Sequence, residues 1–196
     1  MITPEAIAAV VTAAGLSTRM GRPKALLDWH GRPLVAHQVA ALARLRQVVV
    51  VLGHEAEAIG RAVPASPGVR LVLNPAYESG RVSSLVAGFQ AIEAPVEAVL
   101  VVGVDQPLAP GLVAALLAGW DGRSPVAAPT YEGRRGHPVL FRGDLLAELL
   151  AIREETQGLR AVTARHREGR QEVPVPFPEV LLDLNTPEAW RTASGR

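Results

Sequence analysis

The stretch VVTAAGLSTRMGRPKALLDWHGRP, residues 10–33, decides the fold of this chain. It begins with two valines, as a buried strand does, and then passes into small residues and glycines. Gly15 and Gly21 can adopt positive φ angles and let the backbone approach a ligand closely. The free N–H groups of such a loop attract anions, and three cations accompany them: Arg19, Arg22 and Lys24. The stretch therefore predicts a first strand that ends in a phosphate-binding loop, at the edge where α/β sheets bind ligands.

Two common nucleotide-binding loops do not fit this pattern. A Walker A loop would continue with Gly-Lys-Ser/Thr, and a dinucleotide-binding loop would show the spacing G-x-G-x-x-G. Neither pattern occurs in the stretch. The alternative interpretation is a tight glycine turn whose basic side chains are only solvated.

Apolar runs bounded by turn residues recur along the chain, at Ile7–Thr12, Val48–Leu52, Val69–Leu73 and Val99–Val104. They do not alternate polar with apolar residues, so both faces of each strand should be buried, as in central parallel strands. Apolar residues at helical spacing lie between them: Val35, Val39, Leu42 and Leu45; Leu85, Phe89 and Ile92; and Leu112, Leu116 and Leu117. The alternation predicts an α/β fold with a mostly parallel central sheet and helices on both faces.

The regular alternation of strand and helix patterns ends after Trp120. Short strands are expected at Val126–Pro129 and Pro138–Phe141, helices at Asp144–Ile152 and about Leu159–His166, and a last helix from Pro187. No internal repeat or low-complexity linker interrupts the chain. A length of 196 residues suits one domain with a substantial core, so residues 1–196 are expected to form a single domain.

Charge and composition exclude several classes of protein. The formal net charge is only +1, whereas a nucleic-acid binder usually carries a strong basic excess. The absence of cysteine excludes disulfides, thiolate metal sites and cysteine nucleophiles. No apolar run reaches the roughly 18 residues of a membrane span, and the first residues lack the basic region of a signal peptide. The chain is therefore expected to be soluble and cytoplasmic, with neither nucleic acid nor a membrane as its partner.

The first loop resembles the signature A-A-G-x-S-x-R-M-G-x-x-K of the nucleotidyltransferases of the molybdenum-cofactor group. The matching positions are Ala13, Ala14, Gly15, Ser17, Arg19, Met20, Gly21, Lys24, Leu26, Leu27, Gly31, Pro33 and Leu34. The resemblance implies a Rossmann-like nucleotidyltransferase fold, with a nucleotide-binding half at about residues 1–120 and an acceptor-binding half at about residues 121–196. In that family the loop wraps a nucleoside triphosphate. The implied nucleotide-binding residues of the loop are Ala13, Ala14, Gly15, Ser17, Arg19, Gly21 and Lys24, with Arg19 and Lys24 on the phosphates.

A second motif is NPAYESGRVSSLVAGF, residues 74–89. It predicts a helix capped by Ser83 and Ser84, whose N-terminus is free to face an anion; an ordinary capped helix is the alternative. The stretch resembles the family pattern N-P-x-W-x-x-G-x-x-x-S-L, with Tyr77 in place of the usual Trp. This resemblance implies that Asn74, Gly80 and Ser84 lie near the nucleotide.

Candidate metal ligands follow two further apolar segments. In VLVVGVDQPL, residues 99–108, Asp105 stands at the end of a fully apolar strand, where a carboxylate suits Mg²⁺ that bridges triphosphate oxygens. The alternative is a turn aspartate, and the family has Gly where this chain has Val104. In VLLDLNTPEAW, residues 180–190, Thr186 is a candidate N-cap before Pro187. The family pattern D-x-D/N-T-P implies Asn185 as a second metal ligand, with Asp183 as a weaker candidate.

The loop YEGRRGHPVLF, residues 131–141, resembles the family's acceptor-side motif G-x-x-G-H-P-V-L-F. The resemblance implies that Arg135, Gly136 and His137 contact the acceptor; the alternative for His137 is an ordinary hydrogen bond within the loop. TQGLR, residues 156–160, resembles the family's G-D-x-G-A-R with a threonine in place of the aspartate.

In the family, an A-A-G loop is the usual form in members that use a pyrimidine nucleotide, and the methyl group of Ala14 would crowd a purine. The resemblance therefore implies transfer of CMP from CTP to the phosphate of the molybdenum (molybdopterin) cofactor with release of pyrophosphate, Mg²⁺ as cofactor, and Arg19, Lys24 and Asp105 as catalytic residues. Alternatives are GTP as donor, another phosphorylated acceptor, an oxidoreductase that uses NAD(P)H, and a carrier that passes the pterin cofactor to an apo-molybdoenzyme without turnover.

Overall fold

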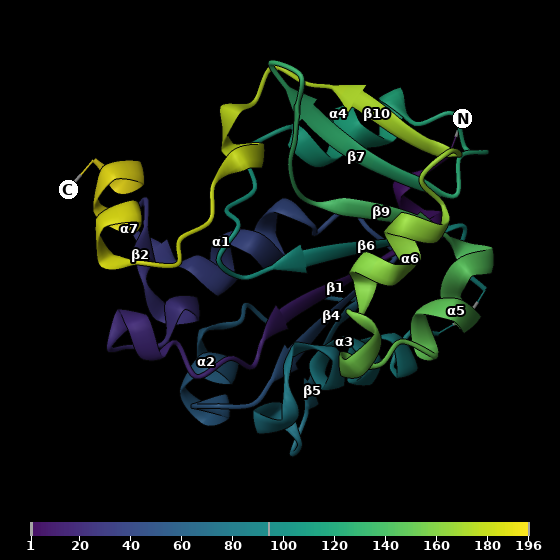
Figure 1. Ribbon diagram of the computed structural model, residues 1–196. Helices are drawn as coiled ribbons and strands as arrows, with labels where there is room; N and C mark the ends of the chain where they lie inside the picture. Colours follow the sequence, from purple (N-terminus) through teal and green to yellow (C-terminus); the bar gives the residue numbers. More distant parts are fainter. Residues whose placement is uncertain (1, 94, 196) are drawn as a thin grey trace.

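The computed structural model describes residues 2–93 and 95–195, and within them it contains an eight-stranded sheet with the strand order β10-β7-β9-β6-β1-β4-β5, to which β8 is added beside β7 (Figure 1). The strands of this sheet are β1 (Ile7–Ala13), β4 (Gln47–Leu52), β5 (Val69–Leu73), β6 (Ala98–Gly103), β7 (Val126–Tyr131), β8 (Arg134–Arg135), β9 (Val139–Arg142) and β10 (Arg170–Pro174). A separate two-stranded hairpin consists of β2 (Asp28–Trp29) and β3 (Arg32–Pro33).

The centre of the sheet is parallel, as the sequence predicts. β1 pairs in parallel with β4 on one side and with β6 on the other, so that Val11 lies between Val50 and Val102. β9 runs antiparallel to both β6 and β7, while β10 is parallel to β7. The carboxyl ends of β1, β4 and β6 therefore share one edge of the sheet, which is where ligands bind in open α/β folds.

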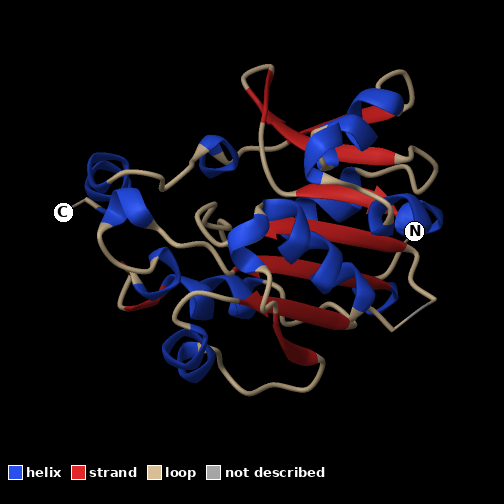
Figure 2. Cartoon of the chain, turned by 60° about the horizontal axis from the view of Figure 1, so that its bottom comes forward, coloured by secondary structure: helices blue, strands red, loops and turns tan. Residues whose placement is uncertain are grey.

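Helices cover both faces of the sheet (Figure 2). They are α1 (Leu34–Ala41), α2 (Ala56–Ala62), α3 (Arg81–Gln90), α4 (Leu112–Gly119), α5 (Leu146–Leu150), α6 (Leu159–Arg165) and α7 (Pro187–Ser194). Residues of β1 such as Val11 pack with α1, α2 and α4, whereas Val10 packs with α3, α5 and α6. Because successive side chains of a strand point to opposite faces, the uninterrupted apolar run of β1 serves two cores at once.

α7 lies apart from the main sheet, beside β2 at one end of the molecule (Figure 1). A small apolar cluster of Trp29, Leu34 and Leu184, with Trp190 packed against it, joins the two elements. Thr186 caps α7 through a 3.2 Å bond from the Ala189 N–H, and Pro187 is the first helical residue, as predicted. This cluster packs the segment before α7 against β2 and the start of α1.

Three sequence expectations about the elements need correction, and two elements were missed. β5 is the last strand on its side, and it leaves Leu71 and Leu73 exposed by 45% and 64%, so its faces are not both buried. The helix expected to reach Leu45 ends at Ala41, and the helix expected from Asp144 begins as α5 only at Leu146 and ends at Leu150. Neither α2, which is only seven residues long, nor β10, whose sequence is rich in proline, was predicted. As an edge strand, β10 tolerates Pro174 at its end.

No helix among the described residues has the length and apolar character needed to cross a membrane.

Candidate active site

Two cavities open at the carboxyl edge of the central sheet. The first, of about 370 Å³, lies against the loop after β1 and is lined by Ala14, Gly15, Lys24 and Ser84, among others. The second, of about 720 Å³, lies between α3, β6, β9 and the segment before α6. Of the described residues, Arg81 and Asp105 line both cavities, so the two spaces meet at these side chains.

The loop after β1 winds through two short 3₁₀ turns, Thr18–Met20 and Lys24–Leu26. The Lys24 N–H donates to Ser17 Oγ at 3.1 Å and closes the loop on itself. Gly21 has the expected positive φ of 67°, but Gly15 does not; the left-handed residue before the turn is Ser17, with φ 53°. A Cβ on Gly15 would meet no atom within 4 Å, so its lack of a side chain matters only to what enters the first cavity.

Lys24 links this loop to two of the three predicted metal ligands. Lys24 Nζ donates to Asp105 Oδ2 at 3.0 Å and to Asn185 Oδ1 at 2.5 Å. The side chains of Lys24 and Asp105 are exposed by only 14% and 24%, which strengthens their attraction compared with a fully solvated pair. Residues that are 81 and 161 positions from Lys24 in the chain thus converge on its ammonium group.

The segment that carries Asn185 is tied to Asp105 by a second set of bonds. The Leu184 N–H donates to the Asp105 carbonyl oxygen at 2.8 Å. Gln106, which is buried, donates from Nε2 to Asp183 Oδ1 at 2.8 Å and accepts from the Gly103 N–H. Val104, which replaces the family's glycine, has no positive φ and donates its N–H to Thr12. Gln106 was not singled out from the sequence, and it positions Asp183 beside Asp105.

The donor set fits a divalent cation that has few protein ligands. No group of three His, Cys, Asp or Glu side chains suited to a metal occurs in residues 2–93 and 95–195. The candidate set is instead one carboxylate, one amide oxygen and the neighbouring Asp183. The Asp105 and Asn185 oxygens already converge on a cation, the ammonium of Lys24. Oxygen ligands of this kind suit Mg²⁺, which binds through one or two carboxylates together with substrate phosphates.

The N-terminus of α3 differs from the prediction. The helix begins at Arg81, so Ser83 and Ser84 lie in its first turn instead of capping it. Their Oγ atoms accept from Asn74 Nδ2 at 2.9 and 3.0 Å. Gly80 and Ser84 line the first cavity as predicted, whereas Asn74 does not. The N-terminus is not free, because the Val82 N–H donates to Glu154 Oε2 at 2.9 Å. Gly80 has a φ of 124°, a backbone conformation that favours glycine at this position.

Replacing Glu154 by alanine is expected to lower the free energy of unfolding by about 0.5–2 kcal/mol, the usual cost of removing a helix cap. Glu155→Ala is the matched control, since it removes the neighbouring exposed carboxylate and leaves the cap in place. Urea unfolding measures the free energy of unfolding of both variants, and an unchanged m value shows that only stability has changed. Equal losses in the two variants would contradict the capping role of Glu154.

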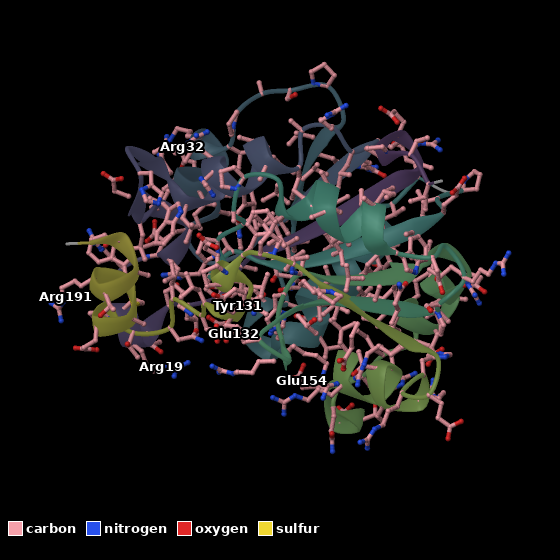
Figure 3. All side chains as sticks on the ribbon, turned by 90° about the horizontal axis from the view of Figure 1, so that it is seen from above. Arg19, Arg32, Tyr131, Glu132, Glu154 and Arg191 are labelled. Atoms are coloured by element: carbon pink, nitrogen blue, oxygen red, sulfur yellow. The ribbon has the colours of Figure 1, made fainter. Side chains whose placement is uncertain are left out.

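The second cavity contains part of the predicted acceptor set together with residues that were not predicted. His137, Asp183 and Asn185 line it, and so does Arg19, which does not line the first cavity. Arg19 and Glu154 lie on the same side of the molecule (Figure 3). Arg135 and Gly136 line neither cavity: Arg135 forms an ion pair with Glu172 at 3.4 Å, and Gly136 packs against the Val180 backbone.

Burial is the main reason that the pKa of His137 lies below its ordinary value, and Arg81 lowers it further, while Asp183 and Asp105 oppose the shift. The imidazole is therefore neutral at pH 7, which suits a hydrogen bond to a ligand better than charge pairing with it. The cations of the second cavity are its arginines. Arg81 and Arg160 line it and were not predicted; the position of Arg81 directly after Gly80 in the second motif was the available signal.

The chain is similar to known nucleotidyltransferases in both sequence and structure. Residues 9–170 match the model of a family described as the MobA-like NTP transferase domain. The molybdenum cofactor cytidylyltransferase of Escherichia coli K12 is 25% identical over 193 residues, which cover 97% of each chain. A molybdenum cofactor guanylyltransferase of Xanthomonas euvesicatoria is 34% identical over 187 residues, covering 92% of this chain and 90% of the relative.

Two solved structures have the same fold. A nucleotidyl transferase from Methanothermobacter thermautotrophicus has a TM-score of 0.79 and 25% identity over 96% of each chain. A Mycobacterium tuberculosis H37Rv protein, solved as a complex with manganese, has a TM-score of 0.76 and 25% identity over 97% of this chain and 98% of its own. The Rossmann-like nucleotidyltransferase fold is thereby confirmed.

Proposed function

This chain belongs to the MobA-like NTP transferase family, and from that premise we propose that it transfers CMP from CTP to the phosphate of the molybdenum cofactor, with release of pyrophosphate. The observation that carries the proposal is the meeting of two cavities at Asp105, beside Lys24 and Asn185. Nucleotidyl transfer needs two anionic substrates to meet at a site of this kind, with cationic groups on both. The relatives with matching length are transferases in name, which favours turnover over a carrier or an oxidoreductase.

The choice of CTP as donor rests on the loop Ala13-Ala14-Gly15. Ala14 lines the first cavity, whose volume of about 370 Å³ also has to hold the triphosphate. Its methyl group leaves less room for a purine than for a pyrimidine, and the relative that matches over 97% of both chains is a cytidylyltransferase. GTP is the alternative donor, because the relative with 34% identity is a guanylyltransferase. The chemistry is the same in both cases and only the base differs.

We further propose that Asp105 and Asn185, with Asp183 beside them, hold a divalent cation, most simply Mg²⁺. The manganese complex of the mycobacterial neighbour supports a divalent metal in this fold. Such an ion, when bound, polarises the phosphoryl oxygens and offsets the charge of the leaving pyrophosphate.

The protein's own groups then position and neutralise the substrates. Lys24 lines the first cavity and meets the phosphates of a nucleotide bound there, while Arg19 approaches them from the second cavity. The acceptor is a phosphate monoester whose second pKa is about 6, so it is already largely ionised at neutral pH. No general base is needed, and none is assigned. Catalysis is positioning plus electrostatic stabilisation, as in phosphoryl transfer generally.

Thermal unfolding with Mg²⁺ and, in turn, CTP, GTP, UTP, ATP and NADPH tests the proposal, followed by a pyrophosphate-release assay with the molybdenum cofactor. A ligand at about 100 times its Kd stabilises the native state by roughly 2.7 kcal/mol. CTP is expected to stabilise the protein, in a way that depends on Mg²⁺ and is lost in Asp105→Ala. A preference for GTP would keep the reaction and change the product, whereas a response to NADPH alone would overturn the proposed function.

A further inference from the structure

Arg81 occupies the boundary between the two cavities. It is the first residue of α3, and it lines both the first cavity, with Ser84, and the second cavity, with His137. The backbone around it is held from the opposite wall, where Glu154 accepts from the Val82 N–H. The start of α3, and with it the base of the Arg81 side chain, is therefore fixed at the junction.

The guanidinium of Arg81 is available for a ligand. In the described part of the chain no carboxylate lies within ion-pair distance of it, whereas Lys24 is engaged by Asp105, and Arg135 by Glu172. Arg81 itself is exposed. A guanidinium presents a planar fork of N–H donors that matches two phosphate oxygens at once. An unpaired fork at the junction of two anion-binding spaces indicates a phosphate ligand.

We propose that Arg81 is a catalytic residue that binds the phosphate of the acceptor and holds it against the α-phosphate of the nucleotide. The proposal rests on the proposed function and adds to it the group that receives the acceptor. Lys24 also lies near the junction, but its ammonium is already engaged by Asp105 and Asn185. Among the described residues, Arg81 is the cationic side chain that lines both cavities and has no ion-pair partner, so it is the group placed to offset the repulsion between the two phosphates as they approach.

Transfer of the nucleotidyl group to the acceptor phosphate requires no proton transfer. An ionised oxygen of the acceptor phosphate forms a bond to the α-phosphorus, the bond from that phosphorus to the β-phosphate oxygen breaks, and pyrophosphate leaves with the electron pair. Negative charge shifts from the acceptor toward the leaving group, while the total charge is unchanged. A cation carried to the attacking oxygen by a fixed helix start lowers the reorganisation that this step needs.

The rest of the second cavity indicates the shape of the acceptor. Its volume of about 720 Å³ is nearly twice that of the first cavity. Besides Arg81 it is lined by the exposed Arg160 and by the half-buried Val139 and His137. A roomy space with two arginines and a neutral imidazole suits a phosphate monoester on a larger ring system with polar edges, which is the chemistry of a phosphorylated pterin.

Steady-state kinetics of Arg81→Gln, Arg81→Lys and Arg153→Gln test the proposal. The donor is held at saturation and the molybdenum cofactor is varied, with pyrophosphate release as the readout. Arg153 is the matched control, because it is an exposed arginine beside Glu154 that lines neither cavity. Arg81→Gln is expected to lower kcat/KM for the cofactor by about 10–100-fold, the usual effect of losing hydrogen bonds to a charged group. Arg81→Lys should retain part of the activity, and Arg153→Gln should match the wild type within about threefold.

Calorimetric titration of the nucleotide with Mg²⁺, without acceptor, separates the two substrates. The Kd of the nucleotide in Arg81→Gln is expected to stay within about threefold of the wild-type value. If Arg81→Gln binds the nucleotide more weakly while its KM for the cofactor is unchanged, Arg81 contacts the donor, and the inference is overturned. Arg81→Gln kinetics equal to those of Arg153→Gln would overturn it as well.

Inorganic phosphate serves as a probe that needs no turnover. With nucleotide present, phosphate is expected to raise the Tm of the wild type and of Arg153→Gln. It is not expected to raise the Tm of Arg81→Gln. If the wild type transfers no nucleotide but shows this pattern, the proposed function fails and the phosphate site at Arg81 stands. If phosphate stabilises Arg81→Gln as much as the wild type, the inference fails whatever the activity.

Discussion

Replacing Lys24 by methionine is expected to lower kcat for nucleotidyl transfer by a factor of about 10²–10³, as the removal of one preorganised cationic donor does in other enzymes. Methionine retains an unbranched apolar side chain and loses only the ammonium group, which lines the first cavity and contacts Asp105 Oδ2 and Asn185 Oδ1. Pyrophosphate release at saturating substrates measures the effect, and circular dichroism checks that the fold is intact. Wild-type turnover in this variant would remove Lys24 from the catalytic residues.

The same substitution is expected to have the opposite effect on metal binding in the absence of nucleotide. The ammonium lies 3.0 Å from Asp105 Oδ2 and 2.5 Å from Asn185 Oδ1, so a metal ion at these oxygens has to displace it. Charges at such distances near a protein surface interact by a few kcal/mol. Since about 1.4 kcal/mol corresponds to a factor of ten in affinity, Lys24→Met should bind Mn²⁺ at least tenfold more tightly. Titration of Mn²⁺ followed by electron paramagnetic resonance measures this affinity.

Arg22→Met is the matched control for the metal titration. This substitution removes the same charge from the same loop. In the wild type the Arg22 guanidinium lies 5.1 Å from the centre of the Trp190 ring. The control should change Mn²⁺ affinity by less than about threefold, because an exposed charge is largely screened. Equal tightening in both variants would mean that net charge controls metal affinity, and that Lys24 does not compete for the ligands.

Asp105→Asn is expected to reduce kcat/KM by about 10³-fold or more, because several kcal/mol of charge stabilisation depend on the metal it would hold. Asparagine preserves the shape of the side chain. The bond from the Leu184 N–H to the Asp105 carbonyl is a backbone bond and stays, so the fold should survive. The affinity for Mn²⁺ should fall together with the activity, which distinguishes a metal ligand from a residue that only orients Lys24.

The neighbouring variants provide a graded comparison. Asn185→Ala is expected to weaken Mn²⁺ binding less than Asp105→Asn, because an amide oxygen is neutral. Asp183→Asn should have the smallest effect of the three, since Oδ1 of Asp183 is already engaged by Gln106 Nε2 at 2.8 Å. If Asp183→Asn loses more Mn²⁺ affinity than Asp105→Asn, Asp183 and not Asp105 is the main metal ligand.

Patterns of neighbouring residues in the sequence predicted the central strands correctly. They did not predict the strands at the edges of the sheet correctly. β1, β4 and β6 are almost entirely apolar, as is typical of parallel strands that are buried on both faces. β5 differs from them by Arg70, a polar residue typical of an edge strand, and its position as the last strand exposes Leu73. β10 was missed because prolines obscure a strand that only an edge position permits, and α2 is too short for a helical period to stand out.

By itself, the sequence determined the parallel centre of the sheet, the loop after β1 and the cap of α7, because each depends on residues close together in the chain. Only the tertiary structure decided that Lys24 contacts Asp105 and Asn185, that Glu154 caps α3, and that Arg81 borders both cavities. The physical reason is that these contacts join residues as far as 161 positions apart. Their distance in space follows from the order of the strands and the packing of helices on both faces, which no local pattern of residues specifies.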